Sequence, residues 1–231
     1  MDNRYYFTQV ENGKVCIKSG EAQHLSRVRR AKVGDEIVAF NGDGFDYHLR
    51  IENITKDEVV CNIIEKQINK AFSDKEIVVY LAMIKNEALT EAIDCMAELN
   101  VKHVKLFKSD YSVAVIDDKK LEKLKNISIQ ASKQCERADV MQVSIINKKD
   151  IEADSKKMEN VFFAYEDSTN GISKFEGGFA VIIGPEGGFS QQENKYFSSF
   201  AKNVSLSKTI LRAQVACVCA VSALKAVSNE S

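Results

Sequence analysis

The stretch Ile182-Ile183-Gly184-Pro185-Glu186-Gly187-Gly188-Phe189-Ser190 decides how the second half of the chain folds. An uninterrupted apolar run from Phe179 to Ile183 leads into it and is typical of a strand buried on both faces. Ser190-Gln-Gln-Glu193 follows and matches the Ser-x-x-Glu capping box that opens a helix. The stretch therefore predicts a strand, a glycine-rich turn and a helix, and open α/β sheets bind ligands at the carboxyl ends of such strands.

The turn itself combines glycines, a proline and a carboxylate. Gly184, Gly187 and Gly188 let the backbone approach a ligand without interference from a Cβ atom. Pro185 is the single proline of the chain, whereas average usage of about 5% would give roughly 11 or 12. Its position in this turn favours a specific conformation there. The alternative to a ligand-binding turn is a tight strand-to-helix turn that binds nothing. Glycine-rich turns of this kind are common in α/β folds.

The composition is that of a globular protein without a membrane span. Of the 231 residues, 45% are hydrophobic and 28% are charged, and the net charge is −1. A membrane helix needs about 18 consecutive apolar residues, and the sequence has no such run. Met1 to Tyr5 also lacks the apolar region of a secretory signal. We therefore expect a cytoplasmic protein that does not associate with membranes.

The six cysteines are not spaced as a metal or redox site. None forms a Cys-x-x-Cys pair, and no histidine lies at zinc-ligand spacing from them. We interpret all six as reduced, small and partly buried residues. The sequence thus predicts no metal ion.

Two patterns of secondary structure divide the chain near residues 69–74. Residues 1–70 contain short β segments with turns such as Asn12-Gly13, which favours a small β-barrel. From residue 73 to 231, strand and helix signals alternate, which is typical of a parallel sheet covered by helices. The expected strands are 4–10, 14–18, 35–40, 47–51, 59–64, 76–83, 101–107, 142–146, 161–165, 179–183 and 203–206. The expected helices are 19–30, 86–99, one after Asp117, 191–201 and 213–227.

A basic cluster lies between Gln23 and Lys32. It contains Arg27, Arg29, Arg30 and Lys32 and no acidic residue. Such a cluster is the electrostatic footprint that a phosphate backbone needs. The alternative is a solvated helix face, which is common for a charged run this short.

The second informative stretch runs from Val204 to Ala216 and again predicts a strand, a turn and a helix. Arg212 stands near the start of that helix, where the helix dipole disfavours a cation. A residue placed against its local preference suggests a function. The alternative is a surface arginine that pairs with a nearby carboxylate.

These motifs together resemble the RsmE family, uridine methyltransferases of the SPOUT class that act on 16S ribosomal RNA. Near the C-terminus the resemblance is carried by Ile183-Gly-Pro-Glu-Gly-Gly-Phe-Ser190 and Ser205-Leu-x-x-x-Ile-Leu-Arg212. Three further stretches extend it over nearly the whole chain: His24-Leu-x-x-Val-x-Arg30, Ala97-Glu-Leu-Asn-Val101 and Ala131-Ser-Lys-Gln-Cys-Glu-Arg137.

The resemblance implies a fold, a cofactor and a reaction. The fold is α/β, with a PUA-like RNA-binding β-barrel in residues 1–70 and a SPOUT methyltransferase domain in residues 73–231. A C-terminal trefoil knot in that domain would bind S-adenosylmethionine (SAM). A homodimer would methylate a uridine at ring nitrogen 3, in 16S rRNA or in the assembled small ribosomal subunit.

The resemblance also implies site residues. Those expected at the cofactor are Ile183, Gly184, Pro185, Glu186, Gly187, Gly188, Ser205, Leu206, Ile210, Leu211, Arg212 and Ala216. Those expected at RNA are His24, Arg27, Arg29, Arg30, Lys32 and Arg137. A uridine imide must lose a proton before it attacks a methyl group, so Arg212 is expected to stabilise the imide anion. Glu186 is a candidate base, or else it holds its loop together.

The motif around Arg212 departs from the family pattern at three positions. Ser207 stands for a glycine, Thr209 for an arginine and Gln214 for a glutamate, and glutamine cannot accept a proton as a base. Gln214 is a catalytic candidate only by its position in the motif. Because it cannot act as a base, the alternative function is an RNA-binding protein with little catalysis. A third possibility, an unrelated nucleotide-binding enzyme, is disfavoured because the usual phosphate-binding motifs are absent from the sequence.

Overall fold

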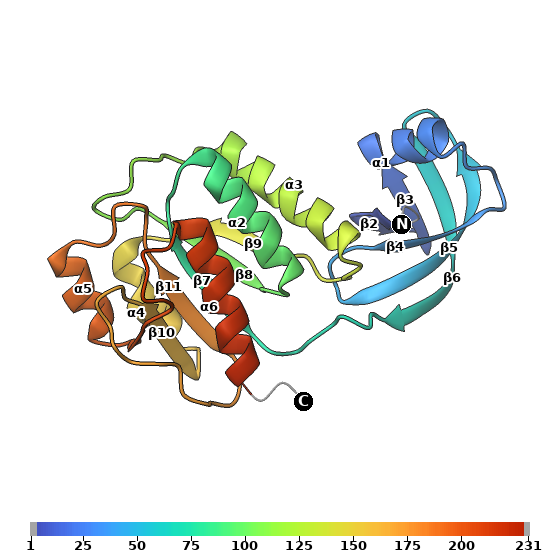
Figure 1. The fold of residues 1–231 in the computed structure, drawn as a ribbon. Coiled ribbons are helices and arrows are strands. Elements are labelled where there is room, and N and C mark those ends of the chain that lie inside the picture. Colours follow the sequence, from blue (N-terminus) through green and yellow to red (C-terminus); the bar gives the residue numbers. More distant parts are fainter. Residues whose placement is uncertain (1–3, 229–231) are drawn as a thin grey trace. The chain divides into compact units, whose positions relative to one another are not determined.

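The computed structural model describes residues 4–228, and the chain divides into two compact units. Of the described residues, the first unit contains 4–73 and 129–140, and the second contains 74–128 and 141–228 (Figure 1). Each unit is built on its own six-stranded sheet. The predicted α/β class with a small N-terminal β domain is thereby confirmed, whereas the trefoil knot stays a prediction.

The first unit is a curled sheet with the strand order β1-β4-β5-β6-β3-β2. Its strands are β1 (Arg4–Tyr6), β2 (Gln9–Glu11), β3 (Lys14–Lys18), β4 (Glu36–Phe40), β5 (Phe45–Ile54) and β6 (Glu58–Ile68). The predicted hairpin at Asn12-Gly13 joins β2 to β3, and both residues have positive φ, 50° and 77°. Two positive φ values in a row are what a type I′ hairpin turn requires.

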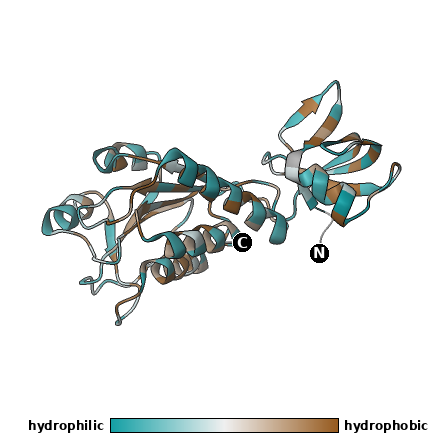
Figure 2. Cartoon of the chain, turned by 90° about the horizontal axis from the view of Figure 1, so that it is seen from above, coloured by the Kyte–Doolittle hydropathy of each residue, from teal (hydrophilic) through white to brown (hydrophobic). Residues whose placement is uncertain are grey.

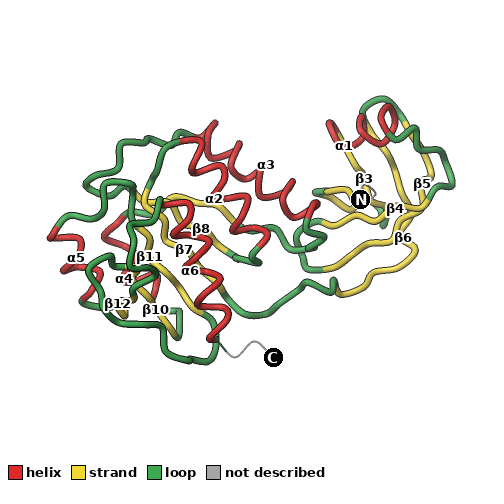
Figure 3. Tube along the Cα trace, viewed as in Figure 1, coloured by secondary structure: helices red, strands yellow, loops and turns green. Residues whose placement is uncertain are grey.

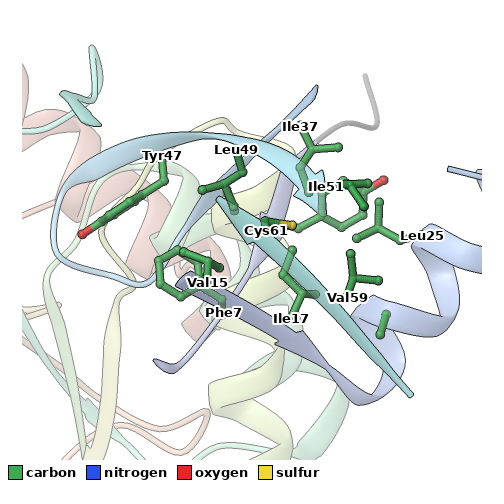
Figure 4. Close-up of a cluster of buried hydrophobic side chains, with 13 residues drawn as sticks. Phe7, Val15, Ile17, Leu25, Ile37, Tyr47, Leu49, Ile51, Val59 and Cys61 are labelled. Carbon is green, nitrogen blue, oxygen red and sulfur yellow. The ribbon is translucent and has the colours of Figure 1, made fainter. Parts of the chain in front are cut away.

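Alternate side chains of these strands form the core of the first unit (Figure 4). Ile17, Leu49 and Val59 are fully buried, and Leu25 packs against them from the segment that follows β3. Cys61 lies in the same cluster, where burial raises the pKa of its thiol to about 12. A thiol with this pKa is inert at neutral pH, which agrees with a packing role.

Two predictions for the first unit were wrong. The expected strand 4–10 is split, because β1 pairs with β4 in parallel whereas β2 pairs with β3. Phe7 lies between them, and burial of its ring turns the chain inward. The expected helix 19–30 is a short α1 (Ser19–Gln23) followed by a π-helical turn at His24–Val28, whose wider bonding includes Arg29 N–H to His24 C=O at 3.0 Å.

The second unit is an all-parallel sheet with the strand order β12-β10-β11-β7-β8-β9. Its strands are β7 (Ile77–Ala82), β8 (His103–Phe107), β9 (Gln142–Ile145), β10 (Asn160–Ala164), β11 (Phe179–Ile183) and β12 (Lys202–Val204). Every residue of the adjacent central strands β7 and β11 is buried, which explains why their sequences are continuously apolar. All six strands were expected close to these positions.

Helices cover both faces of this sheet. On one face α4 (Ile151–Ser155) and α5 (Gln191–Ser198) pack Ile151 and Phe197 against Tyr80, Phe163 and other side chains of that face. The alternate residues of the strands face α2 (Asn86–Glu98) and α6 (Ala213–Val227), which lie side by side (Figure 1). In Figure 2 the helices alternate hydrophilic and hydrophobic stretches, as expected for helices with one buried face.

The remaining helical segments are α3 (Asp118–Gln134) and a 3₁₀ turn, η2 (Lys148–Asp150), that leads into α4. Neither η2 nor α4 was predicted from the sequence, because these segments are too short to show the repeated apolar spacing of an amphipathic helix. None of the helices formed by residues 4–228 has both the length and the apolar composition that a membrane crossing needs.

Candidate functional site

A pocket of about 160 Å³ lies where β10, β11 and β12 end. The loops that leave these strands are drawn in green in Figure 3. Eight residues expected at the cofactor line it: Ile183, Gly184, Pro185, Gly188, Leu206, Ile210, Leu211 and Ala216. Four others, Glu186, Gly187, Ser205 and Arg212, are not among its lining residues. The two stretches that were singled out in the sequence thus meet in space.

The glycine-rich turn is closed by its own backbone. Gly188 N–H donates to Pro185 C=O at 3.0 Å, and Gly188 has a φ of 70°, a conformation that side chains disfavour. A Cβ on Gly184 would lie 2.9 Å from the ring of Phe189. Glycine is therefore required at both positions, and both expose backbone to the pocket.

Glu186 connects two loops and is not among the residues that line the pocket. Its Oε1 accepts a hydrogen bond from Lys85 N–H at 3.1 Å, at the start of α2. The bond joins the loop after β7 to the loop after β11, and Glu186 itself is exposed. This geometry supports the structural alternative for Glu186, the loop-holding role.

The predicted capping box is present and is part of a larger network. Ser190 Oγ accepts from Glu193 N–H at 3.2 Å, and Ser190 N–H donates to Glu193 Oε2 at 3.0 Å. Glu193 is only 2% exposed, and its carboxylate also accepts from Asp110 N–H, Ser109 Oγ and Lys148 Nζ at 2.9, 3.2 and 2.8 Å. One buried carboxylate therefore ties together the segments that follow β8, β9 and β11.

A second ion pair completes this network at the surface. Lys148 Nζ lies 2.6 Å from Asp110 Oδ1, and Ser190 Oγ donates to Asp110 Oδ2 at 2.5 Å. Hydrogen bonds from Lys148 and Ser190 hold the pKa of Asp110 below its ordinary value. Asp110 is therefore ionised at neutral pH and keeps the two loops joined.

Arg212 is the N-cap residue of α6, which confirms its predicted position at a helix start. Its side chain is exposed. Gln214, two residues later, donates from Nε2 to Glu91 Oε2 on α2 at 3.4 Å. Ser207 and Thr209, which replace a glycine and an arginine, bond to each other: their side-chain oxygens are 2.9 Å apart and Thr209 N–H donates to Ser207 Oγ at 3.1 Å. Two of the three departures from the family pattern are thus hydrogen-bonded to each other within this loop.

Nine lining residues were not among those expected from the sequence: Ala164, Tyr165, Glu166, Phe189, Asn194, Ser207, Lys208, Thr209 and Ala213. Two of them carry polar groups of interest. Glu166 is an exposed carboxylate just beyond the end of β10, and the rule that ligands meet the carboxyl ends of strands points to it. Asn194 Oδ1 is buried and has no hydrogen-bond partner among residues 4–228.

The residues expected at RNA separate into exposed and buried groups within the first unit. Arg27, Arg29, Arg30 and Lys32 are exposed, and His24 is half-buried with its ring centroid 6.1 Å from that of Tyr5. In contrast, Arg137 is 2% exposed. Its Nε and Nη2 donate to the two oxygens of Asp139 at 3.1 and 2.6 Å. This bidentate pair is a structural use of Arg137, so the exposed cluster is the better candidate for a phosphate contact.

No arrangement of three or more His, Cys, Asp or Glu side chains within residues 4–228 is suited to hold a metal ion. The candidate site consists of a pocket lined by both apolar and polar residues, a glycine-rich backbone and an exposed arginine.

Known proteins match this chain over nearly its whole length. Relatives named ribosomal RNA small subunit methyltransferase E include those of Rickettsia conorii (27% identity over 98% of this chain and 96% of the relative) and Helicobacter pylori strain 26695 (28% identity, 93% and 96%). A solved structure from Thermotoga maritima, described as a predicted RNA methyltransferase, is 28% identical, with a TM-score of 0.77 and coverage of 97% and 98%. The S-adenosylmethionine-bound methyltransferase E of Neisseria gonorrhoeae shares the fold, with a TM-score of 0.83 at 22% identity over 98% of both chains.

Two family models match the two parts of the chain. The model of an RNA methyltransferase PUA domain matches residues 17–64, and that of an RNA methyltransferase domain matches residues 72–225. Together with the relatives, these matches confirm the resemblance to the RsmE family. The RNA methyltransferase domain model matches residues 72–225, which are most of the sequence and include every residue that lines the pocket. The chain therefore belongs to the RNA methyltransferase family.

Proposed function

We propose that this protein transfers a methyl group from S-adenosylmethionine to ring nitrogen 3 of a uridine in 16S ribosomal RNA. The observation that carries the proposal is the pocket formed by Ile183–Gly188 and Leu206–Leu211, the same stretches that resemble the RsmE family. The names of the relatives supply the small-subunit rRNA, and the bound ligand of the structural neighbour supplies the cofactor. The PUA-domain match supports an RNA substrate.

The pocket residues fit an adenosyl group. Leu206, Leu211 and Ala216 provide apolar walls for adenine, and the backbone at Gly184 and Gly188 allows a close approach. The Glu166 carboxylate suits ribose hydroxyl groups, as acidic residues do in other nucleotide sites. Asn194 Oδ1, which has no partner in the described part of the chain, is an acceptor that a donor of the ligand would satisfy. When bound, S-adenosylmethionine supplies an electrophilic methyl group.

The chain's own residues must favour the deprotonated uridine. Arg212 places an exposed cation at the start of α6, next to the loop that lines the pocket, where it stabilises the negative charge of an imide anion. Glu186 holds the glycine-rich turn through Lys85, and Gln214 contacts Glu91. We therefore assign electrostatic catalysis to Arg212 and positioning roles to Glu186 and Gln214.

The alternative function, RNA binding with little catalysis, is favoured by one specific observation. Gln214 stands where the family has a glutamate, and its amide is directed to Glu91.

We also propose that the protein works as a homodimer in the cytoplasm, where ribosomal subunits are assembled. Two exposed apolar side chains support a partner subunit beside the pocket: Ile210, which lines the pocket (91% exposed), and Val215, which follows the lining residue Ala213 by two positions (41%).

The proposed function is tested by incubating the purified protein with labelled S-adenosylmethionine and either 16S rRNA or small subunits that lack the modification. Mass spectrometry of nucleosides should then detect 3-methyluridine. If RNA and cofactor both bind but no label is transferred, the RNA-binding alternative is correct. If a methylated nucleoside other than 3-methyluridine forms, the assignment of the ring nitrogen is wrong.

Gly184→Ala is expected to weaken S-adenosylmethionine binding about tenfold, because overpacking a tight site costs about 1–3 kcal/mol. The new Cβ would lie 2.9 Å from the Phe189 ring and push it toward the pocket. Calorimetric titration measures the change. Gly171→Ala is the matched control, since a Cβ there meets nothing within 4 Å. Equal affinity in the Gly184 variant and the control would contradict the assignment of this turn to the cofactor.

Reversing two charges, Arg29→Glu with Arg30→Glu, is expected to weaken RNA binding and to reduce the salt dependence. Each lost phosphate contact lowers the slope of log K against log salt by about 1, so a reduction of about 2 is expected. Lys156→Glu with Lys157→Glu is the control, because these side chains are exposed in the second unit. An unchanged slope in the arginine variant would show that the cluster is only a solvated surface.

A further inference from the structure

Tyr111 lies at the edge of the glycine-rich turn and is half exposed. It follows the end of β8 by four residues, and a Cβ on Gly187 would lie 3.3 Å from the Cβ of Tyr111. Its side chain is 54% exposed, although tyrosine rings are usually more buried. Tyr111 is not one of the residues that line the pocket. Tyr111 therefore lies next to the glycine-rich turn, outside the pocket lining, and about half of its surface is open to solvent.

The backbone that carries Tyr111 is held firmly. Ser112 N–H donates to Ser109 C=O at 3.1 Å, and Ser109 N–H donates to Ser112 Oγ at 3.1 Å, which closes a tight turn around Asp110 and Tyr111. The buried carboxylate of Glu193 accepts from Asp110 N–H at 2.9 Å. This turn is therefore fixed to the start of α5, and little backbone conformational entropy remains to be lost when Tyr111 binds a ligand.

A half-exposed aromatic ring on a fixed backbone turn, next to the proposed methyl-transfer pocket, suits a nucleobase. Proteins that recognise single-stranded RNA stack unpaired bases on Tyr, Phe, Trp or His. A target base must leave its stack in the RNA for its ring nitrogen to reach a buried methyl group, and a protein ring compensates for the lost stacking. On this basis, and resting on the proposed function, we infer that Tyr111 is the stacking platform for the pyrimidine base of the substrate RNA.

A competing use of the same surface is contact with a second copy of the chain. Val113 and Val115, on the loop that leads to α3, are 74% and 75% exposed. Burial of such apolar side chains drives association of subunits. The two uses differ in what the ring does: stacking requires any aromatic ring at position 111, whereas a subunit contact requires tight packing and changes the oligomeric state.

Fluorescence tests the inference without relying on methyl transfer. The chain contains no tryptophan, so Tyr111→Trp introduces a single reporter that retains the ability to stack. Its emission should be quenched when a uridine-containing single-stranded oligonucleotide of the target region is added. Val113→Trp is the matched control on the same loop and should show a much smaller change. Quenching of both variants alike, or of neither, would overturn the inference.

Kinetics provide the second readout. Tyr111→Ala is expected to raise KM for the RNA about tenfold, as loss of one base–aromatic stack does, whereas Tyr111→Phe should stay within about twofold. The dissociation constant for S-adenosylmethionine should not change in either variant. A wild-type KM in Tyr111→Ala, or loss of the dimer in that variant, would overturn the stacking role. If the wild-type protein itself transfers no methyl group, the proposed function fails, and the fluorescence result still decides whether Tyr111 contacts the base.

Discussion

Arg212→Ala is expected to lower kcat about 10²- to 10³-fold, the usual loss when a group that stabilises developing negative charge is removed. The guanidinium stands at the N-cap of α6, where the helix dipole already favours an anion. Uridine must become anionic at its ring nitrogen before attack, so this cation acts in the transition state more than in the ground state. Steady-state rates with saturating RNA and cofactor measure the effect.

The binding of cofactor separates this role from a general loss of structure. Because Arg212 is not among the residues that line the pocket, the dissociation constant for S-adenosylmethionine should stay near the wild-type value. Arg212→Lys keeps the charge without the planar fork and should recover part of the rate. Lys195→Ala, which removes an exposed cation from α5, is the control and should retain full activity. A full rate in Arg212→Ala would remove the arginine from the mechanism.

Glu193→Gln is expected to lower the free energy of unfolding by about 3 kcal/mol, because the buried carboxylate accepts several hydrogen bonds and its loss leaves donors unsatisfied. The carboxylate of Glu193 accepts from donors on both oxygens, including Ser190 N–H and Lys148 Nζ. Glutamine has only one acceptor oxygen, and its NH₂ group would face a donor at the other position. Chemical denaturation at neutral pH measures the loss.

A matched change on the surface shows that burial, not charge, is responsible. Glu122 pairs with Lys125 on α3, and its side chain is 66% exposed. Glu122→Gln should therefore alter stability by no more than about 0.5 kcal/mol. Lys148→Arg should be tolerated better than Lys148→Met, because arginine can still pair with Glu193. If Glu193→Gln and Glu122→Gln were equally stable, the network that joins the three loops would contribute little.

Local sequence signals predicted the parts of the fold that local interactions determine. The run Phe179–Ile183 is buried at every residue, and the capping box at Ser190 begins α5 as expected. Helix α6 begins at Ala213 and ends at Val227, as its pattern predicted. In each case an apolar period or a cap that the sequence displays directly fixes the boundary.

Some features that escaped prediction depend on contacts that the sequence pattern does not display. The π-helical turn at His24–Val28 forms where Leu25 enters the barrel core. Arg137 resembled an RNA contact by motif, yet Asp139 binds its guanidinium inside the first unit. Glu166 and Asn194 reach the pocket because β10 and α5 flank β11 in space, and one sequence without the fold does not reveal that adjacency.

The order of strands in the second sheet has a consequence for synthesis of the chain. One edge of β7 pairs with β8, which follows closely in the sequence. Its other edge pairs with β11, so Ile77 cannot pair with Phe179 until β11 has been synthesised. Until β11 leaves the ribosome, a nascent chain exposes a wholly apolar strand with a free hydrogen-bonding edge, the kind of surface that promotes aggregation. Chains that stop before β11 are therefore expected to need chaperones, and premature termination in this region should yield insoluble product instead of a smaller folded domain.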